Sequence, residues 1–507
     1  MARFEWSRIL KQHVGTGSQS RCNGARVSRT RFLPRLDPME ARTLLSTLLV
    51  SNLSDSGTGS LRAAIATPGN GNIIDFAHGL HGTITLASDL PITHGVTING
   101  PGANRVSVSG NDANRIFDIS GNASVSIGGL TITDGLATAG GGILLEGSAA
   151  LNLSNCAFTD NVALGNAAGG GFGGAIEDTS SGGLTVTNST FDANEAVGFG
   201  PNNPTTPGYI LALGGAIDVS YNSSSTSTIS NSTFTGNQAE GGITGASAGG
   251  GALSNSSIIG ATMSVTNCTL SSNAAVGAAG GDGITNFGSG QGGGINDFSS
   301  LNVSNSTLCD NLAQGTPLAR GAVPSQTVSS GSASAGGGIF CLPNFVPAAT
   351  VTVANSTLTG NQAVGGAGAP GSAGSIGEGG GISLIVVPSA LVIGCTLTDN
   401  VAQGGAGGTN SLGAPGVSGG IDLAFGSVVT VNNSFLIGNE AIGGAGGSGS
   451  NGGDGVGGGI NVGTGVIYGT TDDCSLTLTN STLIGNQAVG GAGGSGSTGG
   501  HAWGGGL

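Results

Sequence analysis

A short pattern recurs nine times along the chain and constrains the fold more than any other feature. In residues 184–196 it reads Leu-Thr-Val-Thr-Asn-Ser-Thr-Phe-Asp-Ala-Asn-Glu-Ala, and each copy follows a tetrad such as Gly-Gly-Ala-Ile at 173–176. Every copy has a Phe or Leu three residues before its last Asn and an Ala two residues after it. These last Asn residues are Asn161, Asn194, Asn237, Asn273, Asn311, Asn361, Asn400, Asn439 and Asn486. Self-similarity of this kind indicates a solenoid, in which stacked repeats share one continuous core.

The length of the repeat selects the type of solenoid. From the tetrad to the final Ala a copy spans roughly 22 to 32 residues, which is too short for a strand–helix–strand unit. It fits three short strands and three turns, the content of one rung of a parallel β-helix. Side-chain alternation places Leu184 and Val186 inward. A left-handed bend at Asn188 then shifts the phase, so that Ser189 and Phe191 also face inward.

Stacked rungs lie about 4.8 Å apart, so equivalent side chains form columns. We expect the repeated Asn amides to pass hydrogen bonds from rung to rung. The repeated Ala is expected at a tight corner, and the glycines of the tetrad in a turn with positive φ. Cys156, Cys268 and Cys395 occupy the Ser189 position of their copies. They are three rungs apart, which is too far for a disulfide, and are expected to be small inward fillers.

Composition excludes several classes of protein. Gly accounts for 103 of 507 residues and aromatic residues for only 4%, so the core must be thin and built from small aliphatic side chains. Nine of the 13 Lys and Arg residues lie in residues 1–50, and the rest of the chain is acidic. Such a body cannot neutralise phosphates, and nucleic acid is not expected as a partner. The longest apolar run falls short of about 18 residues, so no transmembrane helix is expected.

The chain divides into three regions. Residues 1–46 form a basic segment without the apolar core of a signal peptide. Residues 47–82 are expected to cap the solenoid, with Ser60 at the start of a helix over Leu61–Ala66 and a first strand over Asn72–Phe76. Residues 83–507 carry the β-helix and stop at the start of another tetrad. An uncapped last rung would expose strand edges, so we expect end-to-end self-association through the C-terminus.

The residues quoted above resemble known families. Residues 31–46 (Arg-Phe-Leu-Pro-Arg-Leu-Asp-Pro-Met-Glu-Ala-Arg-Thr-Leu-Leu-Ser) resemble an N-terminal motif of large exported bacterial surface proteins, with departures at Asp37 and Met39. Residues 55–65 are similar to the opening of extracellular β-helix proteins. The repeats resemble the right-handed parallel β-helix of the pectin-lyase-like superfamily, and more narrowly polymorphic outer-membrane proteins and adhesin-like surface proteins. The resemblance implies an all-β, right-handed parallel β-helix at the cell surface, outside the cell or on a bacterial outer membrane.

Two functions are compatible with this sequence. The first is a non-catalytic surface scaffold that displays Gly-rich loops and contacts matrix or extracellular polysaccharide. Those loops have varied length and are expected to be flexible spacers. The second is a polysaccharide hydrolase that uses a carboxylate patch of Glu177, Asp178 and Asp218. Carboxylates on successive rungs would be about 5 Å apart and would raise one another's pKa. The competing interpretation of these acids, together with Asp297 and Asp422, is a solvated outer face.

Neither a resident cofactor nor a metal site is predicted. The nine full copies of the repeat and the loops between them hold one Arg, Arg320, and no Lys, which disfavours a polyuronate lyase that needs a cationic base. Gly280–Ile284 and Gly452–Val456 are similar to fragments of a calcium-binding nonapeptide repeat but are isolated, so we expect at most weak Ca2+ binding on the acidic surface. Asn-Ser-Thr triplets match a glycosylation sequon, but their Asn residues are expected to serve the left-handed bend; they start at residues 188, 231, 305, 355 and 480.

Overall fold

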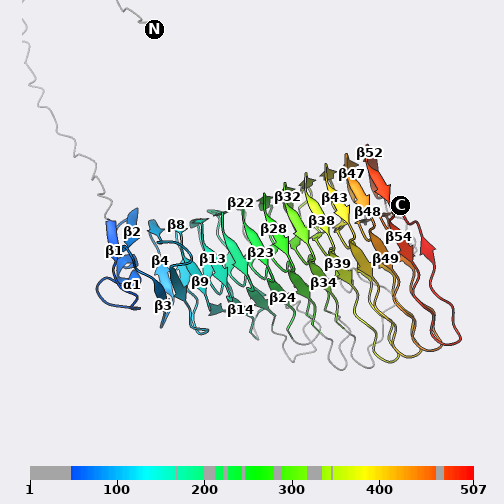
Figure 1. Ribbon diagram of the computed structural model, residues 1–507, viewed down its shortest axis with the longest axis horizontal. Coiled ribbons are helices and arrows are strands. Elements are labelled where there is room, and N and C mark those ends of the chain that lie inside the picture. Colours follow the sequence, from blue (N-terminus) through cyan, green and yellow to red (C-terminus); the bar gives the residue numbers. More distant parts are fainter. Residues whose placement is uncertain are drawn as a thin grey trace, which may run out of the picture. The chain divides into compact units, whose positions relative to one another are not determined.

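The computed structural model shows a parallel β-helix (Figure 1). It describes residues 47–166, 169–198, 212–220, 226–242, 246–278, 288–316, 334–343, 346–463 and 473–507. The basic segment expected over residues 1–46 therefore lies outside the described residues, as do Arg320 and Gly280–Ile284. Five all-parallel sheets run along the rod, with 13, 12, 11, 10 and 9 strands. We name them sheets A, B, C, D and E.

Sheets A, B and C enclose the core. The strands of sheet A are β1 Thr47–Val50, β2 Asn72–Phe76, β5 Val96–Asn99, β8 Ser124–Gly128, β12 Ala150–Ser154, β17 Leu184–Thr187, β22 Thr226–Ser230, β27 Thr262–Thr266, β32 Ser300–Ser304, β37 Val351–Ala354, β42 Ala390–Ile393, β47 Val428–Asn432 and β52 Ser475–Thr479. The strands of sheet B are β3 Gly82–Thr85, β6 Val106–Ser109, β9 Thr131–Thr133, β13 Ala157–Thr159, β18 Thr190–Asp192, β23 Thr233–Thr235, β28 Thr269–Ser271, β33 Thr307–Cys309, β38 Thr357–Thr359, β43 Thr396–Thr398, β48 Phe435–Ile437 and β53 Thr482–Ile484. The strands of sheet C are β4 Leu90–Ile92, β7 Phe117–Ile119, β11 Ile143–Leu145, β16 Ile176–Asp178, β21 Ile217–Val219, β26 Leu253–Asn255, β31 Ile295–Asp297, β36 Ile339–Cys341, β41 Ile382–Ile385, β46 Ile421–Ala424 and β51 Ile460–Val462.

Sheets D and E form a thinner extension beside the core. The strands of sheet D are β10 Leu136–Ala137, β14 Val162–Leu164, β19 Glu195–Val197, β24 Gln238–Glu240, β29 Ala274–Val276, β34 Leu312–Gln314, β39 Gln362–Val364, β44 Val401–Gln403, β49 Glu440–Ile442 and β54 Gln487–Val489. The strands of sheet E are β15 Gly171–Phe172, β20 Ala212–Leu213, β25 Ala248–Gly249, β30 Gly290–Gln291, β35 Ser334–Ala335, β40 Gly377–Glu378, β45 Gly416–Val417, β50 Gly455–Val456 and β55 Ala502–Trp503. The expectation of three strands per rung holds only for the first coils; the later rungs have five.

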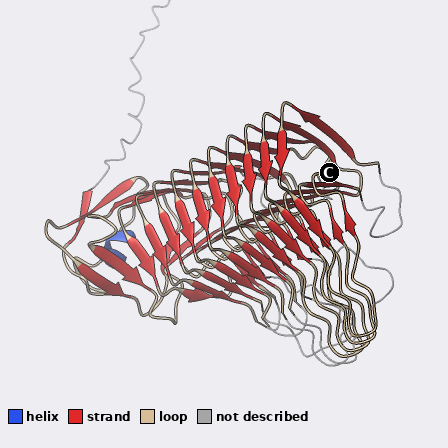
Figure 2. Ribbon diagram, turned by 45° about the vertical axis from the view of Figure 1, so that its right-hand side comes forward, coloured by secondary structure: helices blue, strands red, loops and turns tan. Residues whose placement is uncertain are grey.

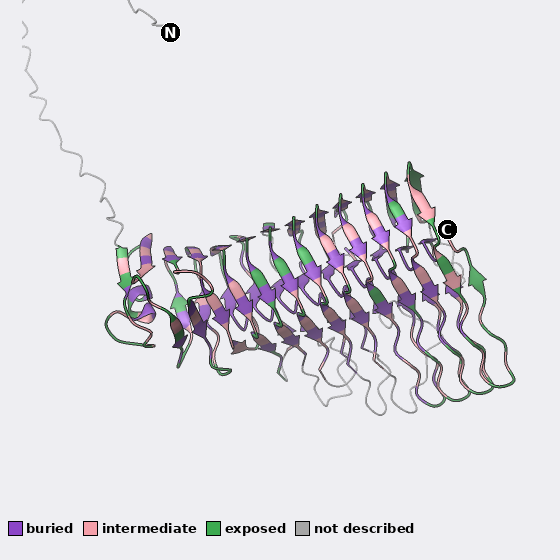
Figure 3. Ribbon diagram, in the orientation of Figure 1, coloured by how far each residue is buried: buried purple, intermediate pink, exposed green. Residues whose placement is uncertain are grey.

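The repeat pattern produces the bends that it predicts. Asn188 has φ 50°, and the equivalent Asn231, Asn305 and Asn355 have φ values of 50–51°. Beyond the bend, Ser189 and Phe191 are both buried, as are Leu184 and Val186 before it. Figure 3 shows this inward burial along the coil. Gly173, the first residue of its tetrad, has φ 58° and makes the turn between sheets E and C.

Two columns hold the rungs in register. The side-chain Nδ2 of each repeated Asn donates to Oδ1 of the Asn in the next rung at 2.8–2.9 Å, without interruption from Asn161 to Asn486. The same Nδ2 also donates to a backbone carbonyl of the previous rung, as from Asn194 to Phe158 at 3.0 Å. Phe158, Phe191 and Phe234 stack face to face with ring centroids 4.7 Å apart. The ladder therefore satisfies polar groups that the coil interior would otherwise leave unpaired.

The N-terminal end is closed by a single turn of helix, α1 Leu61–Ile65. Ser60 accepts a hydrogen bond at its Oγ from the backbone N–H of Ala63, as predicted for the residue that starts this helix. Leu61 and Ile65 are buried against the core. Arg62 pairs with Asp55 at 2.7 Å and donates to the carbonyl of Asp89, which ties the helix to the first coils.

Sheets D and E pack face to face at very short range. The repeated Ala lies in the middle of each sheet D strand and not at a tight corner, so that expectation is wrong. Ala196, Ala239 and Ala275 of sheet D cluster with Ala212 and Ala248 of sheet E, all buried. A Cβ on Gly171 would lie 2.3 Å from the carbonyl oxygen of Ala163 in the facing strand. Only small side chains (Gly, Ala and, at residue 334, Ser) fit between these sheets, which explains the fixed Ala.

The last four Gly-rich loops, residues 365–376, 404–415, 443–454 and 490–501, extend sheets D and E outward (Figure 2); we call this extension the flange. Backbone N–H groups donate to carbonyls of the next rung at every third residue: Gly365 to Gln403, Gly368 to Ala406, Gly371 to Thr409, Gly374 to Leu412 and Gly377 to Pro415. The two limbs of a loop are also bonded, as from Ala414 to Gly405 at 2.9 Å. Three residues per turn without internal hydrogen bonds is the period of a polyproline II helix. These four loops are ordered layers, and the expectation of flexible spacers is wrong for them.

Candidate functional site

The acidic candidates lie on sheet C, directly after the Ile of each tetrad. Strand pairing aligns Glu177 with Asp218, then Ser254 and Asn296, on successive rungs. Alternation directs this column away from the coil interior, yet all four residues are buried. Sheet E lies against this face: a Cβ on Gly249 would be 2.9 Å from Nδ2 of Asn296. The interpretation of these acids as a solvated outer face is therefore wrong.

Glu177 and Asp218 form the acidic part of this column. Burial raises the pKa of Glu177 well above its usual range, and the charges of Asp218 and Asp178 raise it further. Burial also raises the pKa of Asp218 to about 7, while the hydroxyls of Ser254 and Ser256 partly offset the rise. Ser256 Oγ donates to Oδ2 of Asp218 at 3.1 Å. The pair therefore retains a proton to a higher pH than two solvated carboxylates would.

Asp178 and Asp297 lie on the opposite face of the same sheet. Asp178 is aligned between the core residues Leu145 and Val219, and it accepts hydrogen bonds from Ser180 N at 2.9 Å and Ser180 Oγ at 2.7 Å. Asp297 accepts from Nδ2 of Asn255 at 2.7 Å. Neighbouring residues of a strand point in opposite directions. The three candidate residues Glu177, Asp178 and Asp218 therefore do not converge on one groove.

The buried Asp297 makes stability depend on pH. Burial raises its pKa from 3.8 to about 7, so the folded chain keeps a proton that the unfolded chain loses. The stabilisation is complete below pH about 4 and is lost as pH rises toward 7, by up to about 1.4 kcal/mol per pH unit for one group. We expect Asp297→Asn to flatten this decline and to raise the urea midpoint at pH 8. Asp310→Asn, an exposed carboxylate on the same rung, should leave the pH profile unchanged, and equal profiles for both variants would contradict the assignment.

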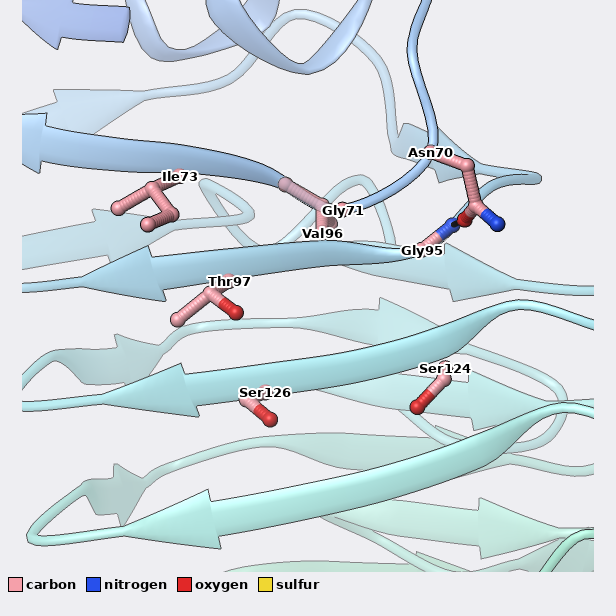
Figure 4. A pocket seen from close by; sticks show the side chains of 8 residues that line it. All are labelled: Asn70, Gly71, Ile73, Gly95, Val96, Thr97, Ser124 and Ser126. Carbon is pink, nitrogen blue, oxygen red and sulfur yellow. Dashed lines mark hydrogen bonds between the residues drawn. The ribbon is translucent and has the colours of Figure 1, made fainter. Parts of the chain in front are cut away.

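Two shallow hollows on the described surface lie away from Glu177, Asp178 and Asp218. The larger, of about 440 Å³, lies at the N-terminal end of sheet A (Figure 4) and is lined by Asn70, Gly71, Ile73, Gly95, Val96, Thr97, Ser124 and Ser126. Asn70 accepts there from the N–H of Gly95 at 2.8 Å. The smaller, of about 290 Å³, is lined by Asp89, Ala113, Asn114, Arg115, Leu136, Ala137 and Thr138. The larger hollow has no acid, base or nucleophile beyond Ser and Thr hydroxyls, so it offers no catalytic pair.

The glycine motif at 452–456 has a structural explanation. Oδ1 of Asp454 accepts a hydrogen bond from the N–H of His501 at 2.6 Å, which links two rungs of the flange. Within the described ranges, no group of three or more His, Cys, Asp or Glu side chains is arranged to hold a metal ion. Ser254 and Asn296 of the same sheet C column were not predicted, because the candidates from the sequence were acids only. Both residues directly follow the last residue of a tetrad, as Glu177 and Asp218 do. This position is polar in most copies of the repeat, and that pattern is the sequence signal for the column.

No protein-family model and no curated protein matches the chain. In the part of the chain that the structure describes, no helix has the length and apolar character needed to cross a membrane.

Proposed function

We propose that this chain is a non-catalytic extracellular or cell-surface scaffold whose rod contacts a polysaccharide or another matrix polymer. The main observation in support of this proposal is a row of hydroxyl side chains that repeats on the outer face of sheet B. Thr190, Thr233 and Thr269 are aligned on successive rungs and exposed. A row of hydrogen-bonding groups spaced about 4.8 Å apart suits a long polymer that presents its own polar groups periodically.

The position of the carboxylates supports a scaffold over a hydrolase. Glycoside hydrolysis needs two carboxyl groups that flank the scissile bond and contact the sugar. Glu177 and Asp218 are each no more than 2% exposed, and Asp178 faces the coil interior. A polysaccharide lying on the rod would not reach them.

The cellular location is proposed from the resemblance of residues 31–46 to an export motif. The parallel coil supports the likeness to pectin-lyase-like and adhesin-like surface proteins at the level of fold. The whole chain has a net charge of −14, and its part beyond residue 50 is more acidic still because most Lys and Arg lie before it, which favours neutral or cationic polymers over polyanions.

A binding experiment tests the scaffold proposal. We expect Thr190→Val/Thr233→Val/Thr269→Val to weaken retention on the polysaccharide that a glycan array identifies by at least about tenfold, because three hydroxyl partners are removed at about 0.5–1.5 kcal/mol each. Valine keeps the shape and strand preference, so the coil should fold. The control is Thr185→Val/Thr228→Val/Thr262→Val on sheet A, where Thr185 is aligned with Thr228 but Thr262 is aligned with Thr226, so these hydroxyls form no single row. Equal binding by both variants would contradict the assignment to sheet B.

The same polysaccharides test the hydrolase alternative. We expect no reducing-sugar release above a buffer blank from the unaltered chain. Turnover that disappears in Glu177→Ala/Asp218→Ala but persists in Asp160→Ala/Asp192→Ala, which removes exposed acids, would overturn the scaffold proposal.

A further inference from the structure

The buried column on the outer face of sheet C contains polar atoms that no described group satisfies. These atoms are Oε2 of Glu177, Oδ1 of Asp218, Oγ of Ser254 and both amide atoms of Asn296. All four residues are at least 98% buried. Leu144 precedes this polar stretch and Phe340 follows it on the aligned strands. Native proteins rarely leave buried polar atoms without a partner, so a row of four such residues indicates that something else binds there.

The charge of the column is also unbalanced. Glu177 and Asp218 lie on paired strands, about 4.8 Å apart along the rod. Among the residues that the structure describes, no Lys or Arg follows Arg115, and no described cationic side chain pairs with Glu177 or Asp218. A buried carboxylate without a counter-charge is costly. Protons supply the balance at acidic pH, and a bound cation would supply it at neutral pH and above.

We propose that the carboxylates of Glu177 and Asp218 bind one Ca2+ ion between two rungs, with the hydroxyls of Ser254 and Ser256 as further oxygen ligands. The available donors are all oxygen atoms, which hard cations prefer, and no imidazole or thiolate is present to select a transition metal. Two carboxylates match the charge of a divalent ion. Ca2+ accepts irregular sets of six to eight oxygens, with water completing the shell, whereas Mg2+ demands a near-ideal octahedron.

Ser254 is the independent indication of a ligand. It lies directly between Asp218 and Asn296 in the strand register and is fully buried, and its Oγ faces Asp218 closely enough to lower the pKa of that carboxyl without forming a hydrogen bond of good geometry. Ser256 already donates to the second oxygen of Asp218. That bond positions Asp218 while leaving its Oδ1 free to bind the ion.

The depth of the site couples binding to folding. Both carboxyl groups become buried only when the rungs containing β16, β21 and sheet E have formed, so the ion is incorporated as the coil closes. Ca2+ must displace any proton held by the pair. Its affinity should therefore rise with pH, by up to about tenfold per pH unit for each proton displaced.

The test uses the full chain, unfolded in chelator and refolded with or without about 1 mM CaCl2 at pH 7.5. We expect the protein refolded with Ca2+ to retain about one ion per chain after gel filtration and to melt about 5 °C higher. Glu177→Gln/Asp218→Asn should retain none and melt at the same temperature with Ca2+ or chelator. Asp160→Asn/Asp192→Asn, which alters exposed carboxylates, should behave like the unaltered chain. MgCl2 and NaCl should give a smaller shift.

Two outcomes would overturn the proposal. The first is refolded protein without bound Ca2+, which would leave the two carboxyls as a proton-sharing pair only. The second is an equal Ca2+ effect in the Glu177→Gln/Asp218→Asn variant, which would place the ion on the acidic surface. Asp218→Asn alone preserves an acceptor for Ser256, so it provides the same comparison if the double variant fails to fold.

Discussion

Replacing Asn311 with Leu is expected to lower the free energy of unfolding by about 4 kcal/mol, because it leaves several buried polar groups unpaired. Oδ1 of Asn311 accepts from both the backbone N–H and Nδ2 of Asn273, at 3.1 and 2.9 Å. Its Nδ2 donates to Leu270 O at 3.0 Å and to Oδ1 of Asn361 at 2.9 Å. Leu fills the volume but restores none of these bonds. The midpoint of urea unfolding, followed by circular dichroism, measures the loss.

Asn302→Leu is the matched control for this substitution. Asn302 belongs to the same rung but lies on the outward face of sheet A, half-buried. The same change of side chain there should alter stability by about 0.5 kcal/mol or less. If both variants unfold at the same urea concentration, the amide ladder does not stabilise the rod.

Gly444→Val is expected to open the flange, at a cost of about 3 kcal/mol or more in local stability. A Cβ at Gly444 would lie 2.0 Å from the carbonyl oxygen and 2.5 Å from the carbonyl carbon of Gly405 in the previous rung. Backbone atoms cannot rotate aside as the end of a flexible side chain would. Hydrogen exchange should become faster across residues 404–415, 443–454 and 490–501, while the coil core remains protected.

The neighbouring Ala445 provides the control, because its side chain is exposed. Ala445→Val places the same side chain one residue away and should leave exchange in the flange unchanged. Rapid exchange in both variants, or in neither, would show that the close glycine packing does not hold these layers together.

Much of the coil was predictable because each rung repeats the same local chemistry. Asn188 tolerates the left-handed region, and the change of phase between Val186 and Phe191 requires a bend between them. The Asn column follows from stacking identical residues at the spacing of hydrogen-bonded strands. These inferences need only the chain itself and its nearest neighbouring rung.

Sheets D and E, together with the flange, were not predicted, although the sequence contains a signal for them. Asn361 and Gly379, the first residue of the next tetrad, are 18 positions apart, and the same offset leads from Asn400 to Ser418, from Asn439 to Gly457 and from Asn486 to Gly504. Loops of equal length can bond to one another along their whole course. The earlier loops, from 12 residues after Asn161 to 25 after Asn311, lack this equality. Composition alone suggested a spacer, because glycine serves both flexible chains and close backbone packing.

The burial of Glu177 and Asp218 could not be read from the sequence for a different reason. Alternation correctly directs them out of the coil, but whether that direction meets solvent depends on where sheet E lies. The turn at Gly173 sets this position, and it returns the chain across the outer face of sheet C. A period of two residues contains no information about a neighbouring sheet.

The equal flange loops also invert the usual rule for where a protein tolerates change. Surface loops normally accept inserted residues more readily than strands do. In the flange, one extra residue in residues 404–415 would displace every third-residue bond to the loops on both sides. A flange loop can therefore change length only if two conditions are met. Each limb must gain or lose whole turns of three residues, and the adjacent loops must change by the same amount. In this part of the rod, each loop must therefore have the same length as the loops of the neighbouring rungs to which it is hydrogen-bonded.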